Sequence, residues 1–158
     1  MEEKNTSFFR FEDLRIYGKA VDYSKWLISV LQDPRTEGEK SLCSAFVNSA
    51  IDIALNIAEG SSRSKSQFDH YLKIAKSAIR ECITFTAIAK GSGLLSESDS
   101  EHSRELLMEQ TRMIGALIIS LQRGSRRRDD SESMGGNEET GFDTMSPDFE
   151  DTIDDLGN

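Results

Sequence analysis

Basic side chains at helical spacing are the residues of this 158-residue sequence best suited to chemistry. Ammonium and guanidinium groups on one side of a helix can contact successive phosphates of a nucleic acid. The alternative is a solvated helix face, because Asp69 and Glu81 lie among the same cations at helical spacing and can pair with them. The candidate residues precede or occupy one predicted helix: Arg63, Lys65, Lys73, Lys76 and Arg80.

A second basic cluster lies at the end of the last predicted helix. Four cations close together in the sequence also suit phosphate contacts. The same cations would complement the negative end of the helix dipole, and Asp129 and Asp130 follow directly and would screen them. The cluster consists of Arg123, Arg126, Arg127 and Arg128.

The sequence lacks the patterns typical of catalytic and metal sites. A di-iron centre in a helix bundle needs Glu-x-x-His on two helices, and neither His70 nor His102 follows a Glu by three residues. Cys43 and Cys82 stand far apart, which excludes a disulfide framework and every paired-cysteine zinc motif. We therefore expect no enzymatic activity, no metal and no cofactor.

Charge is divided unevenly along the chain. Residues 1–128 hold all 19 Lys and Arg and 17 of the 28 Asp and Glu, a net charge of +2, whereas residues 129–158 carry the other 11 acids and no base. The end of the chain is also rich in Gly and Ser, so we expect its first half to be disordered. The resulting division is an N-terminal extension (1–12), a folded body (13–123) and an acidic flexible tail (124–158).

The cellular location expected from the sequence is the cytoplasm. The acidic start is not typical of a signal peptide, and no apolar run approaches membrane-spanning length. Isolated cysteines fit a reducing compartment.

The elements that must position these residues are helices. Apolar residues recur at three- and four-residue steps in four segments, and no strand pattern is convincing. Short connections between long helices favour an all-α fold, an antiparallel up-down-up-down four-helix bundle. The expected helices span residues 13–32, 37–59, 66–91 and 98–123.

Expected helix ends follow from capping residues. Asp13 and Ser66 can cap the first and third helices, and Ser98 with Glu101 forms a capping box before the fourth. Gly60 is placed to take a left-handed conformation after the second helix. The expected apolar stripe of the first helix is Leu14, Tyr17, Val21, Ser24, Ile28 and Leu31.

Several apolar residues lie outside the stripe that one bundle needs. Helices with apolar residues on more than one face pack against two partners, which here favours a homo-oligomer. These residues are Ile74, Phe85, Ile88 and Met108.

A resemblance to a known family begins at Asn56. The string NIAEG at residues 56–60, with Ser61, Ser62 and Arg63 after it, resembles the signature of a bacterial four-helix-bundle family. That family is encoded in intervening sequences of large-subunit ribosomal RNA genes and is similar to the accessory proteins of diversity-generating retroelements. The resemblance covers about residues 8–122. It implies a ring-shaped homopentamer without enzymatic activity, with a nucleic-acid-binding or adaptor role.

Two further stretches agree with the resemblance, and one departs from it. The N-terminal motif is matched by Phe11 to Leu14 with Lys19-Ala20, and the third-helix pattern by Phe68, Leu72, Ile74-Ala75, Ser77 and Glu81. Where the family usually carries an arginine pair in the second helix, this chain has Val47 and Asn48. The substitution removes phosphate contacts from that surface.

Polar motif residues are expected between the second and third helices. They suit either a ligand site or a structural role at the helix end, and we favour the structural role. The polar residues are Asn56, Glu59, Ser77 and Glu81, and Gly60 completes the motif as a helix C-cap in either case.

The end of the tail has the pattern of a short acidic amphipathic helix over residues 147–156. Such a helix would order only by placing Phe149, Ile153 and Leu156 in a groove, and the alternative is an unstructured solubilising tail.

Two functions are compatible with these features. The first is an oligomeric, non-catalytic scaffold that binds nucleic acid, RNA in particular, through its basic patches. The second is a protein-protein adaptor that oligomerises through the bundle and docks an effector protein through its acidic tail.

Overall fold

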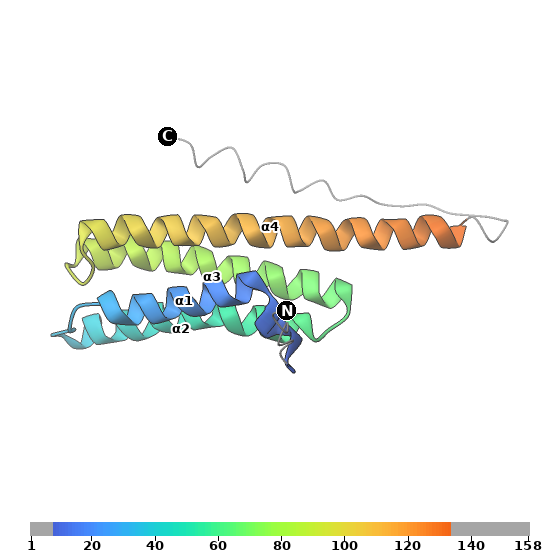
Figure 1. Ribbon diagram of the computed structural model, residues 1–158. Coiled ribbons are helices and arrows are strands. Elements are labelled where there is room, and N and C mark those ends of the chain that lie inside the picture. Colours follow the sequence, from blue (N-terminus) through green and yellow to red (C-terminus); the bar gives the residue numbers. More distant parts are fainter. Residues whose placement is uncertain (1–7, 134–158) are drawn as a thin grey trace, which may run out of the picture.

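The computed structural model describes residues 8–133, with side chains as far as Arg126, and it is built from helices (Figure 1). No strand occurs among these residues. Each long helix packs against the next, and the first also packs against the last, which closes a four-helix bundle. The all-α prediction is confirmed. The elements are η1 (Arg10–Asp13, a 3-10 helix), α1 (Arg15–Val30), α2 (Glu37–Ser61), α3 (Lys65–Gly91) and α4 (Glu97–Ser133).

The helices begin at other residues than their capping patterns predicted. Asp13 lies in η1, and α1 starts after Leu14 without a side-chain cap. The cap of α3 is Ser64, two residues before the predicted Ser66, because Ser64 has the extended backbone that a cap requires and forms a capping box with Gln67.

The predicted capping box of α4 is also displaced. The backbone N–H of Asp99 donates to Ser96 Oγ at 3.0 Å, and Ser96 Oγ donates to Asp99 Oδ2 at 2.6 Å. The helix therefore starts at Glu97, one residue before Ser98, so that Ser98 and Glu101, which were expected to form the capping box, both lie within the helix. Both segments offer several Ser residues, and the sequence pattern alone does not choose among them.

Gly60 does not take the predicted left-handed conformation, because α2 continues through it to Ser61. The glycine with positive φ among the described residues is Gly93, at 77°. Gly60 is buried instead against α3, where an added Cβ would lie 2.6 Å from Cβ of Tyr71 and 2.9 Å from Cδ2 of Phe68. Its role is therefore a close approach of α2 to the start of α3.

The fourth helix is longer than predicted. It passes the expected end at Arg123, runs through Gly124 and ends at Ser133, so that it projects beyond the other helices (Figure 1). A glycine inside a helix costs only about 1 kcal/mol relative to alanine, and arginine is a good helix former. The predicted boundary near Gly124 is therefore not a helix end, and Arg123 to Arg128 belong to one continuous helix.

The core face of α1 also differs from the predicted stripe. Its buried apolar residues are Ile16, Ala20, Tyr23 and Leu27, whereas Ile28 is 58% exposed. Tyr17 and Val21 are half-buried at the edge of the core. The helix packs against both α2 and α4, so its buried centre is rotated away from the stripe that apolar character alone suggested.

A buried hydrogen-bond network joins three helices. Ser103 Oγ of α4 lies 2.9 Å from Tyr23 Oη of α1 and 2.9 Å from Thr86 Oγ1 of α3, and Thr86 Oγ1 lies 2.7 Å from the Cys82 carbonyl. Burial raises the pKa of Tyr23, and burial together with the Glu81 charge raises that of Cys82 to about 12. Buried polar groups need such partners, so the network fixes the register of α1, α3 and α4.

Among the described helices, α2 is long and apolar enough to cross a membrane by length and composition. The prediction that no apolar segment approaches membrane-spanning length is therefore wrong for α2 by length and composition. Core helices of soluble proteins meet the same criteria, and α2 packs against both α1 and α3.

Candidate nucleic-acid interface

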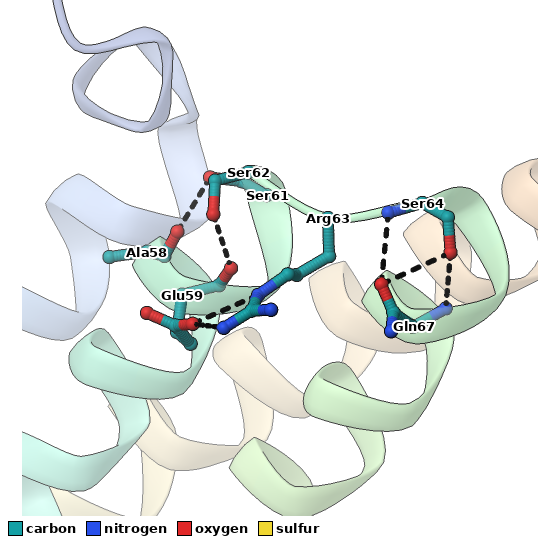
Figure 2. Close-up of polar contacts among 7 residues, drawn as sticks. All are labelled: Ala58, Glu59, Ser61, Ser62, Arg63, Ser64 and Gln67. Carbon is teal, nitrogen blue, oxygen red and sulfur yellow. Dashed lines mark hydrogen bonds and ion pairs between the residues drawn. The ribbon is translucent and has the colours of Figure 1, made fainter.

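The corner between α2 and α3 is held by local hydrogen bonds (Figure 2). Ser61 Oγ donates to the Ala58 carbonyl at 2.8 Å, and Ser62 Oγ donates to the Glu59 carbonyl at 2.9 Å. The guanidinium of Arg63 turns back to Glu59 and donates to its carboxylate through Nε at 2.9 Å. Side chains within residues 58–63 thus donate hydrogen bonds to carbonyls of the last turn of α2, which would otherwise lack partners. These residues have a structural role.

The remaining motif residues do not converge on one site. Asn56 Nδ2 donates to the Asp52 carbonyl one turn earlier in α2, at 2.8 Å. Ser77 Oγ donates to a carbonyl of its own helix α3. Glu81 is the member that bridges two helices, because its Oε2 accepts from Ser49 Oγ of α2 at 2.7 Å.

The cations on the outer side of α3 have partners. Lys73 Nζ lies 2.8 Å from Asp69 Oδ2, and Arg80 donates to Ser77 Oγ at 3.1 Å. Lys76 is half-buried. We call Lys73, Lys76 and Arg80 the α3 face. The Lys73–Asp69 ion pair contributes little stability, but it reduces the net charge that this surface presents to a phosphate, whereas the neutral Ser77 leaves the charge of Arg80 in place.

Arg63 has a partner as well. Its hydrogen bond to Glu59 and the charge of that carboxylate raise the pKa of Arg63. The pairing repeats the i,i+4 arrangement of Lys73 and Asp69, so Arg63 is part of the helix corner.

A different set of cations comes together where α3 begins beside α4. Lys65 is the first residue of α3, and a Cβ built on Gly124 of α4 would lie 3.0 Å from its Nζ. Shallow depressions lie on both sides of Lys65, one bordered by Arg123 and the other by Arg126. We call Lys65, Arg123 and Arg126 the cationic corner.

The three residues of the cationic corner are exposed and form no ion pair within residues 8–126. The structure therefore joins one residue of the first predicted cluster with two of the second. The side chains of Arg127 and Arg128 lie outside the described part, as do those of Asp129 and Asp130.

One carboxylate borders this corner. Asp69 lines the depression next to Arg126, and its Oδ1 is buried without a hydrogen-bond partner within the described residues. Its other oxygen is held by Lys73. Asp69 therefore offsets part of the positive charge between the α3 face and the cationic corner. Its pairing on α3 was expected from its spacing, whereas its position beside Arg126 of α4 was not.

The two histidines lie beside aromatic rings. His102 packs edge-on against Trp26 with ring centroids 5.0 Å apart, and His70 lies 6.0 Å from the ring of Tyr71. Within the described residues there is no group of three or more His, Cys, Asp or Glu side chains that could hold a metal ion.

The tail residues predicted to dock a partner, Phe149, Ile153 and Leu156, lie outside the described residues, and so does the helix predicted over residues 147–156. The first half of the predicted disordered tail is partly described, since α4 extends to Ser133.

Taken together, these observations define a four-helix bundle whose polar α2–α3 turn is held by local hydrogen bonds, with three exposed cations at the junction of α3 and α4 that form no ion pair within residues 8–126. The family model for 23S rRNA-intervening sequence protein matches residues 12–116. The chain belongs to that family, which confirms the resemblance seen in the sequence. Among curated proteins, no significant match to the chain was found.

The match covers only part of the cationic corner. It includes Lys65 but ends before Arg123 and Arg126. Two of the three cations are therefore carried by a section of α4 outside the matched region.

Proposed function

We propose that this protein is a non-catalytic oligomeric scaffold that binds nucleic acid through the cationic corner. The observation that carries the proposal is the convergence of three exposed cations without partners in residues 8–126 at the junction of α3 and α4. RNA is the favoured ligand, because the matching family is named for an intervening sequence of 23S rRNA.

The expected recognition is electrostatic. Ammonium and guanidinium groups contact phosphates and carry no base information by themselves. Three such contacts to a single strand should give log K a slope of about −2 against log salt for each subunit, at about 0.7 per contact. Binding should therefore tolerate changes of sequence and weaken steeply with salt.

Oligomerisation is supported by exposed apolar side chains on α3 and α4. Ile74, Ile88 and Met108 are 38%, 48% and 43% exposed. Phe85, which the sequence placed in the same group, is half-buried and lies 5.7 Å from the ring of Phe46, so the bundle itself accounts for it. In an oligomer the cationic corner would recur once per subunit, and its local charge would multiply.

The test compares two variants with the same loss of charge. The corner variant carries Lys65→Gln, Arg123→Gln and Arg126→Gln, and the α3-face variant carries Lys73→Gln, Lys76→Gln and Arg80→Gln. Fluorescence anisotropy with a labelled single-stranded RNA should show at least about tenfold weaker binding for the corner variant, because three phosphate contacts are lost. A tenfold change corresponds to about 1.4 kcal/mol of binding free energy.

The α3-face variant should change the affinity much less, because Lys73 and Arg80 already have partners. Circular dichroism should show unchanged helicity for both variants. Equal losses in the two variants, or a larger loss in the α3-face variant, would contradict the assignment to the cationic corner.

A further inference from the structure

In the sequence, the last helix, which carries Arg123 and Arg126, is followed by the most acidic part of the chain. After Ser133 the sequence contains eight acidic residues and no basic residue. Within residues 8–126 the corner has no carboxylate paired to it, although Asp69 borders it. The acidic residues after Ser133 are Glu138, Glu139, Asp143, Asp148, Glu150, Asp151, Asp154 and Asp155.

The connection between the two is short. Arg126 lies in the last part of α4, which ends at Ser133, so about 10 Å of helix separates them at 1.5 Å per residue. The 25 residues that follow could extend over about 80 Å at 3.3 Å per residue, which is ample to return to Lys65. A tether of this length holds its charges at an effective concentration in the millimolar range.

We propose that the acidic segment 138–155 docks on the cationic corner of its own chain and competes there with nucleic acid. Carboxylates would occupy the positions around Lys65, Arg123 and Arg126 that phosphates would otherwise take. The competition with nucleic acid rests on the proposed function, whereas the docking of the segment requires only the charges of the chain.

Charge complementarity selects the corner over the α3 face. The charge of Lys73 is already offset by Asp69, and Arg80, although it keeps its charge, already donates to Ser77. The carboxylates of the segment therefore gain most by approaching cations that have no described partner. The apolar residues Phe149, Ile153 and Leu156 are not needed for this contact, which separates it from the docking of an amphipathic helix in a groove.

Docking can be measured without nucleic acid by NMR of the full-length protein labelled with 15N. At about 0.05 M NaCl the amide signals of residues 138–155 should be broadened or shifted, and at about 0.5 M NaCl, where charges are screened, they should become sharp and random-coil-like. The corner variant should give sharp signals already at low salt, and the α3-face variant should behave as the wild type.

Two tail variants complete the design. Changing all eight acidic residues to Asn or Gln should release the segment at low salt, whereas Phe149→Ala, Ile153→Ala and Leu156→Ala together should leave it docked. Sharp tail signals in the wild type at low salt, or release by the triple-Ala change alone, would overturn the proposal.

RNA binding is then a separate measurement. The charge-neutral tail should raise the affinity for single-stranded RNA by about tenfold. This gain is expected if the effective concentration of the tethered segment, in the millimolar range, is about ten times its dissociation constant for the cationic corner. Docking in the NMR experiment with no RNA binding by any variant would refute the proposed function and leave the docking intact. RNA binding that is unaffected by the neutral tail would refute the competition.

Discussion

Two basic regions of this protein look alike in the sequence and differ in the structure. The α3 face has three cations at helical steps, but its lysine at position 73 is paired with Asp69 and its arginine at position 80 with Ser77. The cationic corner gathers cations from two helices, and they have no partner in residues 8–126. On a single helix, the three- and four-residue spacing that aligns cations also places carboxylates beside them. A cluster of cations without carboxylates therefore forms more easily where two helices meet.

The same comparison gives the α3 face a role of its own. Besides its paired cations, the outer side of α3 exposes Ile74 and Ile88, two residues fourteen positions apart that share one side of the helix. Exposed apolar residues beside polar and charged ones are typical of a protein contact. We therefore propose that α3 makes the subunit contact and that the cationic corner contacts phosphates.

The largest expected effect concerns the glycine that brings α2 close to the start of α3, and so places Lys65. Gly60→Ala should lower the free energy of unfolding by about 1–3 kcal/mol, because the new Cβ would meet Cβ of Tyr71 at 2.6 Å. Gly115→Ala is the matched control, since nothing lies within 4 Å of its added Cβ, and it should stabilise the helix by about 0.5–1 kcal/mol. Thermal unfolding measures both, and a stabilised Gly60→Ala protein would show that the close approach is not needed.

Much of the fold could be predicted from the sequence, because four long periodic segments leave little choice of architecture. The helix ends were displaced by one or two residues wherever several Ser residues compete for the cap, as at Ser64 and Ser66. Gly60 was misassigned because a glycine near a helix end suits both a left-handed turn and a close contact, and only the position of Tyr71 decides between them.

The candidate site was less predictable for a related reason. The network of Tyr23, Thr86 and Ser103 and the approach of Lys65 to Gly124 are contacts between residues distant in sequence. Spacing along one helix carries no information about which residue of another helix lies opposite. The sequence could therefore identify the cations and the pairing of Asp69 within α3, but not which cations of α3 and α4 lie together.

The next prediction tests the proposed subunit contact on α3 without changing the cationic corner. Ile88→Asp should weaken self-association by about tenfold or more, because a charge would be buried in the subunit contact. Ile28→Asp changes a 58% exposed residue of α1 in the same way and should leave the association unchanged. Sedimentation at micromolar concentration distinguishes them, and a wild-type protein that sediments as a single species near 17.7 kDa would refute the oligomer.

The smallest expected effect comes from a change of Asp69, which lies between the α3 face and the cationic corner. Asp69→Asn should free Lys73 from its ion pair and raise the RNA affinity two- to threefold, since exposed pairs contribute about 0.5 kcal/mol. Asp22→Asn removes the same charge from a pair with Lys25 on α1 and should have no such effect. Titrations by fluorescence anisotropy compare the two variants, and a gain of equal size in both would indicate net charge alone.

The central claim, that the cationic corner at the junction of α3 and α4 contacts phosphates, is tested most directly by salt dependence. Log K for single-stranded RNA should be measured against log salt for the wild type, the corner variant and the α3-face variant. The corner variant should lose about 2 from the magnitude of the slope per subunit, and the α3-face variant less than about 1. A corner variant that retains the wild-type slope while the α3-face variant loses it would contradict the claim.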